Sequence, residues 1–317
     1  MGIANIISLF PSEKELMDII MDTSKTVWDR DLVEKDIEAW LSNFTGEVYS
    51  VDQEKRLALW LLTHFTFYNH AEVAHLCKVV YNDLIHRIVL NTDTTKIPLE
   101  NAVDDFFSVA NIISPESTSG SGGFIAYFFR HENELPMNIF NFSLKNIGSG
   151  VQHIIVIDDV TLTEGTAGQM YKFWEDATST FKGTNFYLLT LVASQTSINF
   201  LTSKFGIEAI AAIKLDNRDK CFSDESDTFS SFREMSNHKE IIETGKAFAS
   251  HYGTKISIPH IDPLGYADGQ YSFGFFYNIP DNTLPIFWAQ LNGWLPILRR
   301  YHKNYKTQKY LHDERFV

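Results

Sequence analysis

The chain has 317 residues, of which 44% are hydrophobic, and its 40 acidic and 27 basic side chains give a formal net charge of −13. This charge excludes broad, non-specific binding of nucleic acid by the whole surface, although local basic patches remain open. The length exceeds that of a minimal domain, so we expect an α/β core with an added helical region.

The two cysteines and the N-terminal residues indicate the cellular compartment in which the protein is expected. Cys77 and Cys221 are far apart and form no C-x-x-C motif, so neither a disulfide framework nor a zinc site is predicted. The N-terminus lacks a basic region, and no apolar run reaches the length that spans a bilayer. We therefore expect a cytoplasmic protein with free thiols and no membrane contact.

Residues 1–105 are predicted to be helical. Ser12 with Glu15 has the pattern of a capping box, which marks the start of a helix. Apolar residues then recur at helical spacing over residues 57–65 and 73–88, so these helices should each bury one face.

A loop rich in Gly and Ser occupies residues 114–123, between a strand predicted over 109–113 and a helix predicted from Phe124. Such a loop can present backbone N–H donors to an anion, and Arg130 is a candidate charge partner. The loop residues singled out for this role are Ser119, Gly120, Ser121 and Gly122. The alternative, a surface linker that binds nothing, remains open.

Residues 153–167 are the most informative stretch. Ile154 to Ile157 are apolar and β-branched, which predicts a strand that is buried on both faces of a parallel sheet and ends at Asp158. The acids Asp158 and Asp159 precede a loop rich in Thr and Gly, which leads into a helix predicted from about Ala167. Backbone N–H groups at a helix N-terminus suit a phosphate, while paired acids suit sugar hydroxyls or hydrated Mg²⁺. These features predict a phosphoribosyl site; the alternative is a capped turn.

This stretch resembles the phosphoribosyl pyrophosphate (PRPP) signature of type I phosphoribosyltransferases, which has an apolar strand, two acids and a Thr/Gly loop. The resemblance implies that Asp158 and Asp159 are catalytic, hold the ribose hydroxyls and hold Mg²⁺ indirectly. It also implies a 5′-phosphate loop made of Thr163, Glu164, Gly165, Thr166 and Ala167. The Ser/Gly loop before Phe124 would bind the pyrophosphate. Two residues depart from the signature, because Leu162 replaces an acid found in purine members and Glu164 replaces a Gly.

Two further strands are predicted over residues 185–193 and 207–215, with a helix between them over 198–205. Strands that alternate with helices at this interval imply a parallel sheet, with the ligand at the carboxyl ends of the strands. The predicted fold class is α/β, a type I phosphoribosyltransferase-like parallel sheet flanked by helices, with a helical N-terminal extension. The predicted domains are residues 1–105, 106–300 and 301–317.

The C-terminal part carries a second resemblance. Residues 265–270, 277–288 and 292–300 resemble the ending of a bacterial phosphoribosyltransferase-like family of defence gene clusters, including retrons. This implies partners such as a reverse transcriptase with its msDNA or a winged-helix protein, and an oligomer is open. Asn282 and Trp288 are candidate contacts for a base. The alternative is that this turn only packs its segment onto the sheet.

Basic and aromatic side chains alternate near the C-terminus, over residues 299–315. Cations that neutralise phosphates and rings that stack on bases are typical of nucleic-acid contacts. The candidates are Arg299, Arg300, Lys303 and Lys306. The alternative is a solvated tail helix.

Three functions follow from the sequence. The first is a phosphoribosyltransferase-like effector of a prokaryotic antiviral system, which acts with Mg²⁺ on PRPP, a nucleotide or a ribosyl acceptor. The second is a non-catalytic module that senses PRPP or a nucleotide, which Leu162 and Glu164 favour. The third is a housekeeping nucleobase phosphoribosyltransferase.

Overall fold

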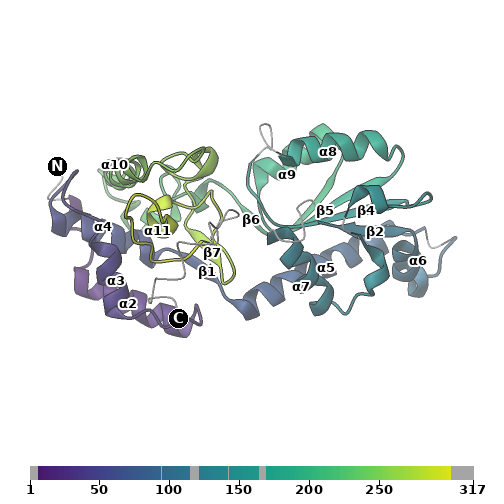
Figure 1. Cartoon of the computed structure of the whole chain (residues 1–317), viewed down its shortest axis with the longest axis horizontal. Helices are drawn as coiled ribbons and strands as arrows, with labels where there is room; N and C mark the ends of the chain where they lie inside the picture. Colours follow the sequence, from purple (N-terminus) through teal and green to yellow (C-terminus); the bar gives the residue numbers. More distant parts are fainter. Residues whose placement is uncertain (1–5, 94, 115–120, 142, 164–168, 301–317) are drawn as a thin grey trace.

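Two lobes, one helical and one built on a sheet, make up the protein (Figure 1). The structure is a computed structural model, and it describes residues 6–93, 95–114, 121–141, 143–163 and 169–300. The helical lobe lies at the left of Figure 1 and contains both the first helices and the last part of the described chain.

Five parallel strands form the sheet, in the order β3-β2-β4-β5-β6. Their bounds are Ala110–Ile113 for β2, Phe140–Asn141 for β3, His153–Thr161 for β4, Asn185–Ser194 for β5 and Glu208–Leu215 for β6. β4 is central, because it pairs with β2 on one side and with β5 on the other. The predicted parallel α/β sheet is confirmed.

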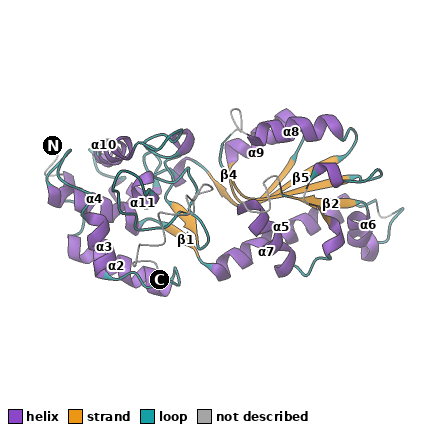
Figure 2. Cartoon of the chain, in the orientation of Figure 1, coloured by secondary structure: helices purple, strands orange, loops and turns teal. Residues whose placement is uncertain are grey.

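Helices cover both faces of this sheet (Figure 2). One face carries α5 (His70–Asn91), α6 (Ala102–Ser108) and α7 (Ser121–Glu132), and the other carries α8 (Gln169–Thr180) and α9 (Gln195–Phe205). Alternate residues of a strand point to opposite faces, so Ile155 packs with α5 and α7 while Ile154 packs with α8 and α9. Both are 0% exposed, as a strand buried on two faces requires.

The predicted end of the central strand at Asp158 is wrong. β4 continues to Thr161, with Val160 paired to Val192 and Thr161 paired to Ala193. Val160 and Thr161 are β-branched, which favours extended backbone, so the strand runs past the two acids. Asp158 and Asp159 therefore lie inside the strand near its carboxyl end.

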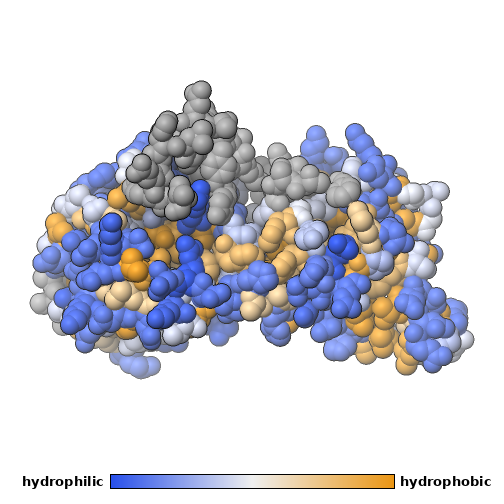
Figure 3. Space-filling view, turned by 60° about the horizontal axis from the view of Figure 1, so that its bottom comes forward, coloured by the Kyte–Doolittle hydropathy of each residue, from blue (hydrophilic) through white to orange (hydrophobic). Residues whose placement is uncertain are grey.

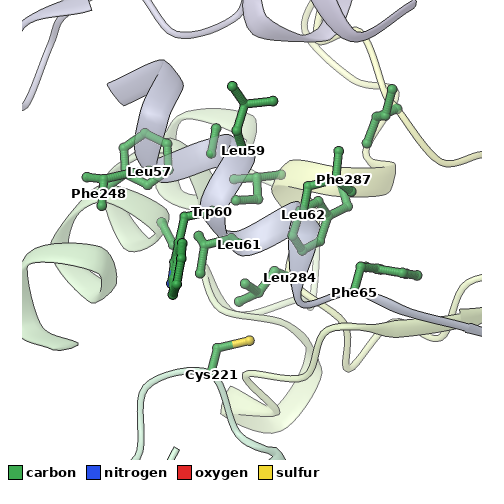
Figure 4. Packing of buried hydrophobic residues seen from close by; sticks show 14 of the residues in the cluster. Leu57, Leu59, Trp60, Leu61, Leu62, Phe65, Cys221, Phe248, Leu284 and Phe287 are labelled. Atoms are coloured by element: carbon green, nitrogen blue, oxygen red, sulfur yellow. The ribbon is translucent and has the colours of Figure 1, made fainter. Parts of the chain in front are cut away.

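The helical lobe brings together segments from the two ends of the chain. Its helices are α2 (Glu13–Thr26), α3 (Glu34–Leu41), α4 (Val51–Thr63), α10 (His238–Ile256) and α11 (Pro285–Trp288), with a parallel pair of short strands, β1 (Thr66–Tyr68) and β7 (Phe273–Phe275). The predicted capping box of Ser12 and Glu15 is present at the start of α2. Figure 4 shows α4 side chains such as Leu61 packed among residues from the C-terminal half.

Indole hydrogen bonds fasten the C-terminal segment to the first helices. The N–H of Trp40 in α3 donates to the carbonyl of Ile286 at 2.8 Å, and the N–H of Trp294 donates to the same oxygen at 3.1 Å. Burying an indole N–H without such a partner is costly, so these bonds stabilise the packing of α11 against α3.

The two lobes have hydrophobic cores that are built from different parts of the chain. The core of the helical lobe draws on residues between 6 and 67 and between 221 and 298, whereas α5 packs in the core of the sheet lobe. Tyr271, Phe273 and Phe275 also pack in the sheet-lobe core, so β7 contacts both lobes. The predicted domain limits at residues 105 and 300 stay predictions.

Hydrophobic residues are also found on the surface. In the view of Figure 3 they gather over the sheet lobe, while the helical lobe is mainly hydrophilic. Leu90 is 83% exposed and Met137 is 69% exposed. Among the helices that the structure describes, none combines the length and the apolar composition needed to cross a bilayer.

A buried carboxylate organises the turn between α3 and α4. Glu54 is 0% exposed and accepts hydrogen bonds from the backbone N–H groups of Gly46, Val48 and Tyr49 at 2.7, 2.7 and 3.1 Å. The hydroxyl of Tyr252 in α10 donates to the same carboxylate at 2.5 Å. This carboxylate thus links α4, the preceding turn and α10.

We expect Glu54→Gln to lower the free energy of unfolding by about 2–4 kcal/mol, because a carboxamide turns an acceptor into a donor that faces N–H groups. Chemical denaturation at neutral pH measures this difference. Glu38→Gln makes the same change at an exposed residue of α3 and should stay within about 0.5 kcal/mol of wild type. Equal stabilities of the two variants would contradict the expectation.

Candidate functional site

The carboxylate of Asp159 is held by donors from two distant segments of the chain. The hydroxyl of Ser121, the first residue of α7, donates to Oδ1 at 3.3 Å, and the hydroxyl of Tyr277 donates to Oδ2 at 3.2 Å. The backbone N–H of Asp159 donates to Oδ1 of Asp158 at 2.9 Å. Both acids are 8% exposed, so these bonds act in a largely water-excluded environment.

The start of α7 lies close to the acid pair because Gly122 has no side chain. A Cβ at this position would lie 2.8 Å from Oγ of Ser114 and 3.4 Å from Oδ1 of Asp158. Residues 121 and 122, which the sequence assigned to a pyrophosphate loop, are thus beside the two acids. Backbone N–H groups in the first turn of α7 have no intrahelical partner, and the helix dipole is positive there.

A pocket of about 230 Å³ opens beside the acid pair, between the two lobes. The sheet lobe contributes polar lining from Ser121, Asp158, Asp159, Thr161 and Thr163, and the helical lobe contributes Tyr266, Asn278, Asp281, Asn282 and Arg300. Rings of Tyr171, Trp174 and Phe200 in α8 and α9 form an apolar part of the wall. Pockets at the carboxyl ends of parallel strands are common ligand sites.

Arg300 fastens the wall that the helical lobe supplies. Its guanidinium donates to the carbonyl of Ile279 and pairs with the carboxylate of Asp281 at 3.3 Å. The centre of the guanidinium lies 4.9 Å from the ring centroid of Trp288. The amide of Asn282 donates to the carbonyl of Tyr266 at 2.9 Å, which closes the same turn. The wall is therefore built from hydrogen-bonded side chains.

Several residues singled out from the sequence meet in this pocket. They are Ser121, Asp158, Asp159, Thr163, Asn282 and Arg300. Asn282 is 6% exposed and lines the same pocket as the acid pair.

Three other candidates lie away from the pocket. Trp288 is 2% exposed, and its indole N–H donates to the carbonyl of Thr283, so it does not line the pocket as a base contact would. The guanidinium of Arg130 lies 5.6 Å from the ring of Tyr127, outside the pocket lining. Arg299 lines a different cavity.

The remaining candidates fall outside the residues that the structure describes, and their roles stay predictions. They are Ser119, Gly120, Glu164, Gly165, Thr166, Ala167, Lys303 and Lys306.

The structure adds site residues that sequence reasoning missed. Tyr277 is 118 positions from Asp159 along the chain, and no local pattern connects them. Tyr266 and Asp281 reach the pocket in the same way, from the C-terminal segment. Only the resemblance of residues 265–300 to a family ending marked this segment as distinctive.

A comparison with protein families identifies the group to which the chain belongs. A family model described as PRTase-CE matches residues 37–300. The chain belongs to the PRTase-CE family. This phosphoribosyltransferase-like family membership agrees with the parallel α/β fold and confirms the family resemblance of the sequence.

Two solved structures are similar to this PRTase-CE chain. An orotate phosphoribosyltransferase from Aeropyrum pernix is 18% identical, with 37% of this chain and 65% of that chain covered and a TM-score of 0.25. The chain thus spans less than two thirds of that enzyme. A Helicobacter pylori xanthine-guanine-hypoxanthine phosphoribosyltransferase is 11% identical, with 47% and 86% covered and a TM-score of 0.29. A search of curated proteins found no match.

Asp158 and Asp159 of this PRTase-CE chain suit a Mg²⁺ ion whose coordination comes mainly from water and a bound sugar, not from protein side chains alone. Among the described residues, no group of three or more His, Cys, Asp or Glu side chains could hold a metal ion. Two adjacent carboxylates on one pocket wall suit the water shell and the sugar oxygens around Mg²⁺, which keeps several waters when it binds.

The hydroxyl of Tyr277 stays protonated over the whole ordinary pH range. Burial raises its pKa well above 10, and the negative charge of Asp159 adds to this effect. The hydroxyl therefore remains a hydrogen-bond donor to Asp159.

We expect wild type to lose free energy of unfolding faster than Tyr277→Phe as the pH rises above 10. The unfolded tyrosine releases its proton near pH 10 while the folded one keeps it, so stability present at lower pH is lost. The slopes should differ by up to about 1.4 kcal/mol per pH unit. Denaturation from about pH 9 to about pH 11 measures this, with Tyr127→Phe, an exposed hydroxyl, as control. Parallel curves for wild type and Tyr277→Phe would contradict it.

Proposed function

We propose that this chain binds PRPP or a related ribose phosphate, together with Mg²⁺, at the acid pair. The observation that carries the proposal is the position of Asp158 and Asp159 at the carboxyl end of β4, in a pocket between the lobes. Membership of the PRTase-CE family supports it. In this proposal, the Thr/Gly loop that follows the acids in the sequence binds the 5′-phosphate of the ribose.

The residues of the pocket have distinct parts in this proposal. Carboxylates accept hydrogen bonds, so Asp158 and Asp159 take the ribose hydroxyls. Ser121 and Tyr277 keep the carboxylate of Asp159 in one orientation, which reduces the ordering that the ligand must supply. The N-terminus of α7 faces the same space and suits the pyrophosphate. Bound Mg²⁺ supplies positive charge that offsets the phosphates and the acids.

The biological part of the proposal is an effector in a prokaryotic antiviral system, acting on PRPP, a nucleotide or a ribosyl acceptor in the cytoplasm. Its support is the C-terminal segment, residues 265–300, whose sequence resembles the ending of defence-associated relatives. In the structure this segment forms one wall of the pocket through Tyr266, Asp281 and Arg300. The proposed partners are a reverse transcriptase with its msDNA or a winged-helix protein.

We expect the double variant Asp158→Asn/Asp159→Asn to bind PRPP at least about tenfold more weakly than wild type, because two charged acceptors for the ribose hydroxyls are replaced by amides. Isothermal titration calorimetry with PRPP and MgCl₂ measures the change.

The matched control is Asp176→Asn, which makes the same substitution at an exposed residue of α8. Its affinity should equal that of wild type. Wild type that gives no heat with PRPP, or a double variant that binds as wild type does, would overturn the proposed ribose site.

A specific observation favours the second candidate, a module that senses PRPP without turnover. Leu162 stands where purine members have an acid, and it is 9% exposed in the hydrophobic core of the sheet lobe. No carboxylate is therefore available at this position to act as a base, and proton transfer would need another group.

Incubation with labelled PRPP separates the two candidates. A transferase with a nucleobase present should release pyrophosphate and transfer the labelled ribose phosphate, whereas a sensor should return the PRPP unchanged. If Leu162 marks a sensor, we expect turnover no faster than in the Asp158→Asn/Asp159→Asn variant. Transfer well above that background would exclude the sensor. It would also leave open the housekeeping transferase, for which growth rescue of a salvage-deficient strain is the test.

A further inference from the structure

A second cavity, of about 840 Å³, lies in the helical lobe and shares no lining residue with the acid-pair pocket. It is lined by residues 28–32 between α2 and α3, by α3, β1 and the start of α5, and by Phe276 and residues 290–299. Its volume lies within the range of roughly 300–1,000 Å³ that small-molecule and cofactor sites occupy.

Rings and guanidinium groups give this cavity the chemistry that a nucleotide requires. Aromatic side chains stack with nucleobases, and guanidiniums pair with phosphates. The centre of the Arg30 guanidinium lies 5.2 Å from the ring centroid of Phe67, so a cation and a ring already lie together in the wall. The lining residues of these two kinds are Trp28, Arg30, Phe67, Phe276, Trp294 and Arg299. Trp28, Phe67 and Trp294 are 2%, 3% and 7% exposed, so the partly buried Phe276 offers the most accessible ring.

Carboxylates limit what the cavity can hold. Asp29 and Asp36 line it together with the two arginines. Carboxylates repel phosphates but accept hydrogen bonds from ribose hydroxyls and exocyclic amines. A lining that has both cations and acids therefore favours a ligand with a phosphate end and a hydroxyl-rich, aromatic end over a bare polyphosphate.

Two pairs of consecutive residues connect the cavity with the acid pair. Phe276 lines the cavity, and the next residue, Tyr277, donates its hydroxyl hydrogen bond to Asp159. Arg299 lines the cavity, and the next residue, Arg300, lines the acid-pair pocket. A ligand that shifts either cavity residue therefore acts on a neighbour that either lines the pocket, as Arg300 does, or bonds to Asp159, as Tyr277 does.

Aromatic packing strengthens the first of these connections. The ring of Phe276 lies 5.2 Å from that of Tyr277 and 6.0 Å from that of Phe124 in α7. His70, also in the cavity lining, lies 5.1 Å from Phe276. Close-packed rings transmit small displacements, because such packing leaves few voids to absorb them.

We propose that this cavity is an effector site for a nucleotide, and that its occupation changes the affinity of the acid pair for PRPP through residues 276–277 and 299–300. The binding half stands by itself, whereas the coupling half rests on the proposed function. A free nucleotide and the 5′-phosphorylated end of a strand share this chemistry.

The experiment measures binding of AMP by calorimetry, with adenosine and tripolyphosphate as probes that each lack one half of the nucleotide. We expect saturable binding of AMP to wild type and to Asp158→Asn/Asp159→Asn. Arg30→Gln and Arg299→Gln should each weaken it about tenfold, the loss expected when a charge-assisted hydrogen bond is removed. Thermal melting establishes that each variant is folded.

The matched control is Arg233→Gln, which removes an exposed arginine of the helical lobe that lines neither cavity. It should bind AMP as wild type does. A 5′-phosphorylated oligonucleotide gives the second arm, and tighter binding of the strand than of AMP would assign the site to strand ends.

Coupling is measured by titrating PRPP and MgCl₂ with and without saturating AMP. We expect the affinity for PRPP to change about fivefold or more in wild type, and to change less in Arg299→Gln at the same AMP concentration. An unchanged affinity in wild type would overturn the coupling.

The outcomes separate this proposal from the proposed function. No AMP binding by folded wild type would overturn the effector site. AMP binding that is lost in Asp158→Asn/Asp159→Asn and kept in the arginine variants would also overturn it, since the nucleotide would then occupy the acid-pair pocket. AMP binding that depends on Arg30 and Arg299, without any PRPP binding, would support the effector site and overturn the proposed function.

Discussion

The burial of β4 on both faces is the constraint on which the site depends. Residues 154–157 are at most 2% exposed, so the polar side chains of this strand lie at its ends, with the two acids near the carboxyl end. A buried carboxylate is costly unless donors surround it. Ser121 and Tyr277 provide such donors for Asp159, and they come from distant segments of the chain. The need to satisfy one buried acid therefore brings α7 and the C-terminal segment to the same point.

The end of the C-terminal segment both fixes a turn of the backbone and lines cavities. Arg300 is tied to Ile279, Asp281 and Trp288, and its side chain is 16% exposed. Little of it is accessible to a strand of nucleic acid, and its evident effect is to fix the turn that faces the acid pair. Arg299 next to it borders the second cavity instead. Arg299 and Arg300 thus lie between the acid-pair pocket and the second cavity.

The features that were predicted correctly from the sequence are those that local sequence patterns determine. The β-branched run before Asp158, the alternation of strands and helices and the capping box at Ser12 are short-range signals, and the sheet and helices follow them. It could not predict that β4 passes the acids, because strand length also depends on pairing with β5. Nor could it reveal that Tyr277 meets Asp159 or that Trp288 is buried, since both depend on contacts between distant segments.

The composition of the helical core also constrains how the chain folds as it is synthesised. Residues up to 67 share that core with residues 221–298, whereas the five-stranded sheet draws only on residues between these two segments. The sheet can therefore assemble while the first helices still lack their packing partners from the C-terminal half. At typical translation rates this interval lasts roughly 10–50 seconds, during which the apolar surface of α2 to α4 that residues 221–298 later cover is exposed. Chaperones that bind nascent apolar helices would have their longest access to this protein at its N-terminus.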